Sequence, residues 1–293
     1  MTDHDKRAQL FDSGYTVVEG VLDGPSLDRL RSLAAGCVSG LSPEHRAKYR
    51  SEGSLIPVAD HPAFADFIGH PCVLAAFDRL ELDDVRFTSG YVISKPPEGP
   101  ALFWHQDWWG WDDPISYTDR LAQFFVFFYL TDTTPENGCL RVIPGTHRKR
   151  HPMHDVMDAH TEALAQVTDP DSAAYADHPD QVAVPVKAGD MVIGDARLIH
   201  GTYPNGSGQE RTLITLWYHP GYAQLPEPIR ARLQEIYCRR GVDTDADAAS
   251  GLYPDTWPPA ARAKVASLLP DYEGSAAPHP WNRTCLLYTS PSP

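Results

Sequence analysis

The sequence predicts an all-β core of the sandwich or jelly-roll class, with helical segments before and after it in the chain. Between about residues 85 and 220, short stretches rich in β-branched and aromatic residues alternate with turn residues, a pattern typical of antiparallel strands. On either side of this region, apolar residues recur at the three- and four-residue spacing of helices. We therefore expect residues 1–284 to form one domain with a β core and helical flanks.

The N-terminal part of the chain alternates strand and helix signals. Residues 15–22 (YTVVEGVL) are rich in β-branched side chains and predict a strand. Asp23-Gly24-Pro25 then provides a capping side chain and a proline for a first helical turn, so residues 26–38 predict a helix. A further helix is predicted over residues 62–80, and both helices are expected to pack on the outside of a sheet.

The β-rich region is divided by turn residues into six predicted strands. Asn137-Gly138 is a hairpin signal between two of them. The long polar segment 147–178 is expected to run over the mouth of the barrel. Beyond residue 220 the pattern is again helical, at residues 226–237 and 258–269. The six strands are expected at residues 86–94, 122–130, 139–143, 182–187, 190–194 and 212–219.

The last nine residues, 285–293 (CLLYTSPSP), differ in character from the rest of the chain. They resemble the translated read-through of a sequencing adapter, and the alternative is a genuine tail rich in serine and proline. We expect a non-native tail here and leave it out of the fold prediction.

The amino-acid composition disfavours some classes of binding partner. With 25 basic and 39 acidic residues the net charge is −14, which argues against nucleic acid and against an anionic membrane surface as partners. The start of the chain is polar and shows no secretory signal, and the longest apolar run, residues 124–130, is too short to span a bilayer. The five cysteines form no CxxC pair, as expected in a reducing compartment. We therefore expect a cytoplasmic protein that acts on a small molecule, and the sequence leaves its oligomeric state open.

Three residues could hold a metal ion. In a strand, His105 and Asp107 would point to the same face, and His200 follows later in Leu198-Ile199-His200-Gly201. Two imidazoles and one carboxylate leave metal positions open, which suits redox-active Fe(II). Arg211 begins the next strand, where a hairpin would bring its guanidinium beside His200 to bind a dicarboxylate. A cupin-like hydrolase or isomerase with Zn(II) or Mn(II), and a non-enzymatic jelly roll that binds a small molecule, remain alternatives.

Three ordered motifs resemble the phytanoyl-CoA dioxygenase family of Fe(II)- and 2-oxoglutarate-dependent oxygenases. They are Trp104-His105-Gln106-Asp107, the segment NGCLRVIPGTH at residues 137–147, and His200-Gly201-Thr202 followed by Arg211. The resemblance covers residues 10–220 and implies a double-stranded β-helix that uses Fe(II), 2-oxoglutarate and O2 to hydroxylate a small-molecule metabolite.

The resemblance also implies roles for individual residues. His105, Asp107 and His200 would be the catalytic iron ligands, and Arg211 with Thr202 would bind the distal carboxylate of 2-oxoglutarate. Because related halogenases replace the ligand carboxylate with a small residue, the retained Asp107 favours hydroxylation. Two further cosubstrate contacts implied by the family's pocket are Tyr91 and Phe127, for which ordinary core packing is the alternative.

Substrate contacts are predicted next to the metal motif. If strand alternation continues past Asp107, Trp109 shares the metal face, so Trp109 and Gln106 are our candidates, with core packing as the alternative for the tryptophan. Asp195 could support His200 or form a turn. The remaining histidines of the polar segment fit no zinc motif and are expected to be loop residues: His147, His151, His154 and His160.

Overall fold

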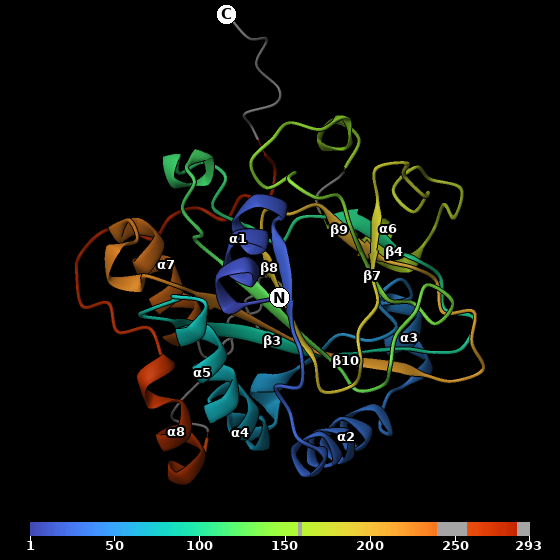
Figure 1. The fold of residues 1–293 in the computed structure, drawn as a ribbon, viewed down its shortest axis with the longest axis horizontal. Coiled ribbons are helices and arrows are strands. Elements are labelled where there is room, and N and C mark those ends of the chain that lie inside the picture. The colour runs from blue at the N-terminus through green and yellow to red at the C-terminus, as the bar shows by residue number, and fades with distance from the viewer. Residues whose placement is uncertain (158–159, 239–256, 286–293) are drawn as a thin grey trace, which may run out of the picture.

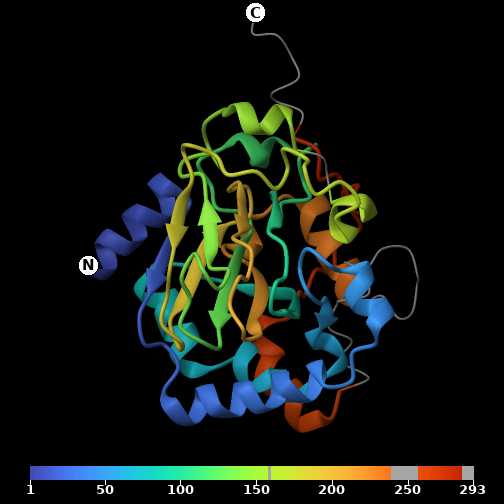
Figure 2. The ribbon, with the colours of Figure 1, turned by 90° about the vertical axis from the view of Figure 1, so that its right-hand side faces the viewer.

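Two antiparallel sheets face one another in the computed structural model, and helices cover the outer face of the larger sheet (Figure 1 and Figure 2). The structure describes residues 1–157, 160–238 and 257–285. Residues 286–293, most of the predicted non-native tail, lie outside this description. Among the described residues, no helix has the length and apolar character needed to cross a membrane.

The strand order is that of a jelly roll, which confirms the predicted double-stranded β-helix. All neighbouring strands pair antiparallel. The larger sheet contains, in spatial order, β1 (Tyr15–Val18), β8 (Met191–Asp195), β5 (Phe124–Tyr129), β10 (Arg211–His219), β3 (Arg86–Lys95) and β2 (Ile56–Pro57). The smaller sheet contains β4 (Leu102–His105), β9 (His200–Thr202), β6 (Leu140–Val142) and β7 (Val182–Val184).

Strand β5 shows how one sequence supplies two cores. Its six residues, FFVFFY, are all buried, because one face of the strand packs on helices and the other faces the smaller sheet. Phe124, Val126 and Phe128 join the core between sheet and helices. Phe125 and Phe127 join the core between the two sheets, where the functional site lies.

The helices lie mainly along one side of the larger sheet, and their start signals are local. Asp23 caps α2, since its carboxylate accepts a hydrogen bond from the Ser26 amide at 2.8 Å. The predicted helix over residues 62–80 is broken after α4 because Pro71 lacks an amide hydrogen and restrains His70 to an extended conformation. The helices are α1 (Asp3–Ser13), α2 (Gly24–Val38), α3 (Pro43–Lys48), α4 (Ala65–Ile68), α5 (Pro71–Arg79), α6 (Glu162–Gln166), α7 (Glu227–Cys238) and α8 (Pro259–Val265).

Two expectations about the β core were wrong. The larger sheet begins before residue 85, because β1 and β2 extend it at its two edges. Asn137-Gly138 does form a turn, in which Gly138 adopts a φ of 87° and the Cys139 amide donates to the Thr134 carbonyl at 3.0 Å. The turn does not make a hairpin, however, because β5 and β6 belong to different sheets.

Candidate metal centre and its cavity

The two predicted histidine ligands sit opposite one another on neighbouring strands. His105 ends β4 and is the cross-strand partner of His200, which begins β9, and their ring centroids are 4.2 Å apart. A β-bulge just before His105 turns its side chain toward this partner. Gly201 permits the close approach of the strands, since a Cβ there would lie 2.8 Å from the Leu102 carbonyl oxygen. The register of β4 and β9 therefore places both imidazoles at one point.

Hydrogen bonds fix the tautomer of both imidazoles. Nδ1 of His105 lies 2.9 Å from the Phe103 carbonyl, and Nδ1 of His200 lies 3.0 Å from the Leu198 carbonyl. A carbonyl only accepts, so each Nδ1 carries the hydrogen and each Nε2 keeps a lone pair for a metal. Burial, followed by the neighbouring imidazoles of His200 and His160, lowers the pKa of His105 well below its usual value. His105 is therefore held as the neutral ligand form.

Asp107 reaches the histidines by a route that strand periodicity does not describe. Strand β4 ends at His105, and the next residues are irregular. The Asp107 amide instead donates to the Ala196 carbonyl at 2.7 Å, which ties this segment to the approach to His200. The structure is thus consistent with the prediction that Asp107 lies beside the two histidines. The argument from strand alternation, on which that prediction rested, was wrong.

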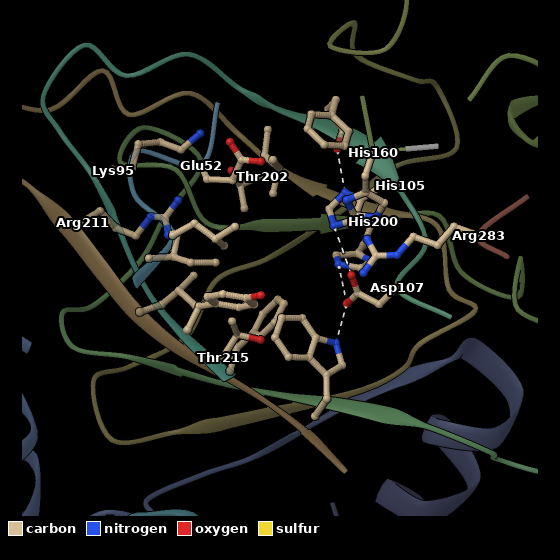
Figure 3. Close-up of a pocket in the computed structure, with 18 residues that line it drawn as sticks. Glu52, Lys95, His105, Asp107, His160, His200, Thr202, Arg211, Thr215 and Arg283 are labelled. Atoms are coloured by element: carbon tan, nitrogen blue, oxygen red, sulfur yellow. Dashed lines mark hydrogen bonds and ion pairs between the residues drawn. The ribbon is translucent and has the colours of Figure 1, made fainter. Parts of the chain in front are cut away.

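The three donors fit a metal ion. Nε2 of His105 lies 3.6 Å from one carboxylate oxygen of Asp107, and Nε2 of His200 lies 3.6 Å from the other. Bonds of about 2.1 Å, the length of zinc–imidazole bonds, can join donors at this spacing to one ion. Figure 3 shows the three side chains converging from β4, from β9 and from the segment that follows β4 in the chain. Two imidazoles and one carboxylate are a donor set that suits Fe(II).

Trp217 holds the carboxylate ligand. Its indole Nε1 donates to Oδ2 of Asp107 at 3.0 Å, from the far end of β10. A hydrogen bond to a metal-binding carboxylate fixes the direction of its lone pairs. The sequence analysis missed this residue, because nothing in the local sequence around Trp217 distinguishes it from a core aromatic.

The variant Trp217→Phe should weaken metal binding by about 10- to 100-fold, since supporting hydrogen bonds of this kind have effects of that size. Titration of the apoprotein with Fe(II) under anaerobic conditions measures the change. Trp257→Phe is the matched control. This substitution also removes an indole hydrogen bond, the one that Trp257 donates to the Ala59 carbonyl, but Trp257 belongs to the core between the larger sheet and the helices. Equal metal affinity of Trp217→Phe and the wild type would contradict the positioning role.

Arg211 lies at the other end of the same cavity, where a cosubstrate carboxylate is expected. Its side chain is 1% exposed, and all three guanidinium nitrogens lack a hydrogen-bond partner among the described residues. The hydroxyls of Thr202 and Thr215, which line the cavity with Arg211, are buried and unpaired in the same way. Buried polar groups of native proteins are almost always paired, so this cluster indicates a missing anionic ligand.

Arg211 lies in the same cavity as the histidines because the two sheets face one another. The expected hairpin does not exist, because β9 lies in the smaller sheet and β10 in the larger one. Arg211 is the cross-strand partner of Lys95 on β3, and both side chains line the cavity. Burial and then the charge of Arg211 lower the pKa of Lys95 well below its usual value. The Lys95 ammonium donates to the Pro100 carbonyl, and the sequence analysis did not identify this residue as part of the site.

Tyr91 and Phe127 both line the cavity, as the family resemblance implied. Tyr91 packs edge-on against Trp217, with ring centroids 5.8 Å apart. Phe127 lies between the sheets, with its ring centroid 6.0 Å from that of His200. Their positions are compatible with cosubstrate contacts, which stay predictions.

The two substrate candidates are placed elsewhere. The side-chain amide of Gln106 donates to the Arg197 carbonyl, and Gln106 does not line the main cavity, so its position gives no support to the proposed substrate contact, which stays a prediction. Trp109 does not line the main cavity either; it stacks on Trp281 beside a smaller cavity that adjoins Asp107. Strand alternation failed for Trp109 because the chain is irregular after His105.

Asp195 does not support His200, whose Nδ1 is bound to the Leu198 carbonyl. Its carboxylate pairs with Arg197 at 2.7 Å, and Arg197 binds three backbone carbonyls of the segment before β5. The alternative role of Asp195 in a turn at the strand end is therefore the correct one.

One loop histidine belongs to the site, contrary to the sequence prediction. His160 lines the cavity, and its ring packs edge-on against His105 at 4.9 Å. Its Nε2 lies 3.1 Å from the Gln106 carbonyl and so carries a hydrogen, which leaves only Nδ1 as a possible metal donor in the cluster that His160 forms with His105 and Asp107. His160 therefore brings the polar segment into contact with the predicted metal ligands.

A second cluster of possible ligands, His151, His178 and Asp180, is better explained without a metal. Nδ1 of each histidine accepts a backbone amide hydrogen, from Met153 in one case and Asp180 in the other. Each Nε2 must then carry the hydrogen of a neutral ring and offers no lone pair. His151 accordingly faces the Asp180 carboxylate at 3.2 Å, as a loop hydrogen bond.

Comparison with known proteins finds related sequences. Residues 11–213 match the family described as Phytanoyl-CoA dioxygenase (PhyH). Phytanoyl-CoA dioxygenase 1 of Oryza sativa subsp. japonica is 33% identical over 159 residues, which are 53% of this chain and 52% of the rice protein. Ectoine dioxygenase of Sphingopyxis alaskensis is 27% identical over 156 residues, 50% of each chain. The chain thus spans about half the length of these relatives.

Solved structures share the fold. HygX from Streptomyces hygroscopicus, crystallised with nickel, 2-oxoglutarate and hygromycin B, superimposes with a TM-score of 0.54 at 18% identity. The match covers 74% of this chain and 87% of HygX. At this identity the likeness concerns the arrangement of strands and helices.

Proposed function

Because this chain belongs to the phytanoyl-CoA dioxygenase family, we propose that it is an Fe(II)- and 2-oxoglutarate-dependent dioxygenase that hydroxylates a small-molecule metabolite. The reaction converts a substrate C–H bond, 2-oxoglutarate and O2 into C–OH, succinate and CO2. One observation carries the proposal beyond the family: the guanidinium of Arg211, which is buried and has no hydrogen-bond partner in the described part of the chain, lines the same cavity as His105, Asp107 and His200.

The metal would be held by Nε2 of His105, Nε2 of His200 and the carboxylate of Asp107. When bound, Fe(II) and 2-oxoglutarate supply the oxidation by O2, which amino-acid side chains cannot perform. The part of the protein is to hold the ligands at a fixed spacing, through the two carbonyls on Nδ1 and the indole of Trp217 on Asp107.

The cosubstrate would lie between the two sheets with its distal carboxylate at Arg211. A planar guanidinium can bind a carboxylate through two parallel hydrogen bonds, and the hydroxyl of Thr202 can donate a third. Apolar side chains also line the cavity, among them Ile93, Phe127 and Leu213. Such walls exclude water and so strengthen the ionic contact.

The retained Asp107 supports hydroxylation, since the carboxylate keeps the position that a halide would need. A hydrolase or isomerase with the same metal ligands would not require a buried arginine that binds the carboxylate of a cosubstrate. A non-enzymatic binding protein would not require the metal ligands. The alternative functions therefore explain fewer of the observed residues.

Substrate identity does not transfer from the relatives. The names of the two curated relatives specify phytanoyl-CoA and ectoine, and HygX was crystallised with hygromycin B, so proteins of this fold differ widely in the molecules they hold. The cytoplasmic location and the absence of nucleic-acid and membrane partners also stay predictions.

A succinate-release screen tests the proposed reaction. The purified protein, loaded with Fe(II), is incubated with 2-oxoglutarate, O2 and a library of small metabolites, and His105→Ala serves as the inactive control. We expect at least one metabolite to stimulate succinate release and to gain one oxygen atom. Product formation without O2 consumption or succinate would instead indicate a hydrolase or isomerase.

A further inference from the structure

Thr215 lies between the two ends of the metal cavity. Every second side chain of a strand points to the same face, and four alternate residues of β10 line the cavity: Arg211, Leu213, Thr215 and Trp217. Arg211 begins this series and would anchor the distal carboxylate of 2-oxoglutarate. Trp217 ends it with the hydrogen bond to Asp107. Thr215 is therefore the polar side chain of β10 that lies between the cosubstrate anchor and the metal site.

The Arg211 guanidinium lies beside the Leu213 position of the strand. Its central carbon is 5.4 Å from the ring centroid of Tyr129, and Tyr129 is the cross-strand partner of Leu213. Thr215 follows two residues later, about 7 Å further along the strand. A ligand that extends from the guanidinium to the metal ligands must therefore pass Thr215.

The cross-strand partners of Thr215 lie close to the metal ligands. These partners are Phe127 on β5 and Tyr91 on β3. The ring centroid of Phe127 is 6.0 Å from that of His200, and Tyr91 packs edge-on against Trp217, the residue that holds the carboxylate ligand. Thr215 is thus placed at the metal end of the cavity, beyond the guanidinium.

The Thr215 hydroxyl has no hydrogen-bond partner among the described residues, although the residue is only 1% exposed. A buried hydroxyl without a partner destabilises a protein, and valine would fill the same space without that cost. The charged groups of Glu52 and Lys95 also line the cavity, and Figure 3 shows both on the side where Arg211 lies. The hydroxyl therefore indicates a polar ligand atom at the metal end.

Resting on the proposed function, we propose that the Thr215 hydroxyl donates a hydrogen bond to the oxo-acid end of 2-oxoglutarate, the end that would face the metal. Arg211 and Thr202 would hold the distal carboxylate, so the cosubstrate would be held at both ends and would meet the metal in one orientation. Thr215 and Thr202 would then have different roles, although both hydroxyls are buried and lack a partner among the described residues.

Two 2-oxo acids separate the two ends. 2-Oxopentanoate has the five-carbon chain and the oxo-acid end of 2-oxoglutarate but no distal carboxylate. Each acid is titrated into the anaerobic Fe(II) protein, and its charge-transfer band measures the dissociation constant. Thr215→Val, which keeps the shape of the side chain, should weaken both acids equally, by about 2- to 10-fold. It should also shift the wavelength of the band, because the lost hydrogen bond acts on the group that receives the transferred charge.

Thr202→Val is the contrasting variant in the same cavity. Because the Thr202 hydroxyl would donate to the distal carboxylate, this variant should weaken 2-oxoglutarate and leave 2-oxopentanoate unchanged. Thr16→Val is the control for loss of a buried hydroxyl. Thr16 is fully buried on β1, donates to Gln9 at 3.0 Å and does not line the cavity, so both affinities and the band should stay as in the wild type.

The proposal is overturned if Thr215→Val binds both acids as the wild type does, or if it weakens only 2-oxoglutarate, since the hydroxyl would then serve the distal carboxylate. Thr215→Ser keeps the hydroxyl and should retain most of the affinity. An equal defect in the serine and valine variants would indicate packing and would overturn the proposal as well. A wild-type protein that binds Fe(II) but gives no band with 2-oxoglutarate would overturn the proposed function separately.

Discussion

Replacing His105 by alanine is expected to reduce succinate release to below about one-thousandth of the wild-type rate. A bound metal stabilises the transition state by several kcal/mol, and a loss of about 4 kcal/mol corresponds to a factor of about 1,000. His105 would supply one of three protein donors, and its Nε2 is the atom that lies 3.6 Å from the Asp107 carboxylate. The remaining imidazole and carboxylate would hold the ion too loosely to keep it in place.

The rate and the metal content of the purified variant are measured together. His219→Asn is the matched control: His219 is also fully buried, but its Nδ1 binds the Ala122 carbonyl at 2.9 Å and it does not line the cavity. The asparagine amide can keep that hydrogen bond, so turnover should persist. A His105→Ala protein that is folded, holds stoichiometric iron and retains turnover would show that His105 is not a ligand.

Replacing Arg211 by alanine is expected to raise the apparent KM for 2-oxoglutarate by about 30-fold or more. Removal of one partner from a buried hydrogen-bonded charge pair costs about 2–5 kcal/mol, and 2 kcal/mol alone corresponds to about 30-fold. The effect should fall mainly on KM, because Arg211 lies at the far end of the cavity from the predicted metal ligands and, on the proposed function, would anchor the cosubstrate without touching the reacting atoms.

Thermal denaturation gives a second readout for Arg211 that does not depend on turnover. The guanidinium is buried without a hydrogen-bond partner among the described residues, so the apoprotein gains little from it. We expect 2-oxoglutarate with metal to raise the Tm of the wild type and to have a much smaller effect on Arg211→Ala at the same concentration. An unchanged KM together with an equal rise in Tm would exclude Arg211 from the cosubstrate site.

Much of this site could be predicted from the sequence because its chemistry depends on residue types in ordered motifs. The histidines, Asp107 and Arg211 were identifiable without knowledge of their contacts, and the structure places all of them in one cavity. The fold class was also predictable, since turn residues and β-branched segments alternate over most of the core. The two-residue periodicity of strands predicted side-chain positions less well where the backbone departs from a regular strand.

The errors have specific physical causes. The chain departs from strand geometry after His105, so alternation misplaced Trp109. Both presumed hairpins connect strands of different sheets, a distinction that a turn sequence such as Asn137-Gly138 does not encode.

The residues that were missed come from segments distant in sequence. Trp217 reaches Asp107 across 110 positions of the chain. Arg283 lines the same cavity and packs on Trp281, which in turn stacks on Trp109. Such contacts are made only by the folded chain, and a single sequence carries no local signal for them.

The most direct test of the account is the visible absorption spectrum of the anaerobic protein with Fe(II) and 2-oxoglutarate. If His105, Asp107 and His200 hold iron beside a cosubstrate anchored at Arg211, addition of 2-oxoglutarate should produce a metal-to-ligand charge-transfer band. The band should be absent from His105→Ala and should require a higher 2-oxoglutarate concentration in Arg211→Ala. A wild-type protein that is loaded with Fe(II) but gives no such band would contradict the proposed oxygenase.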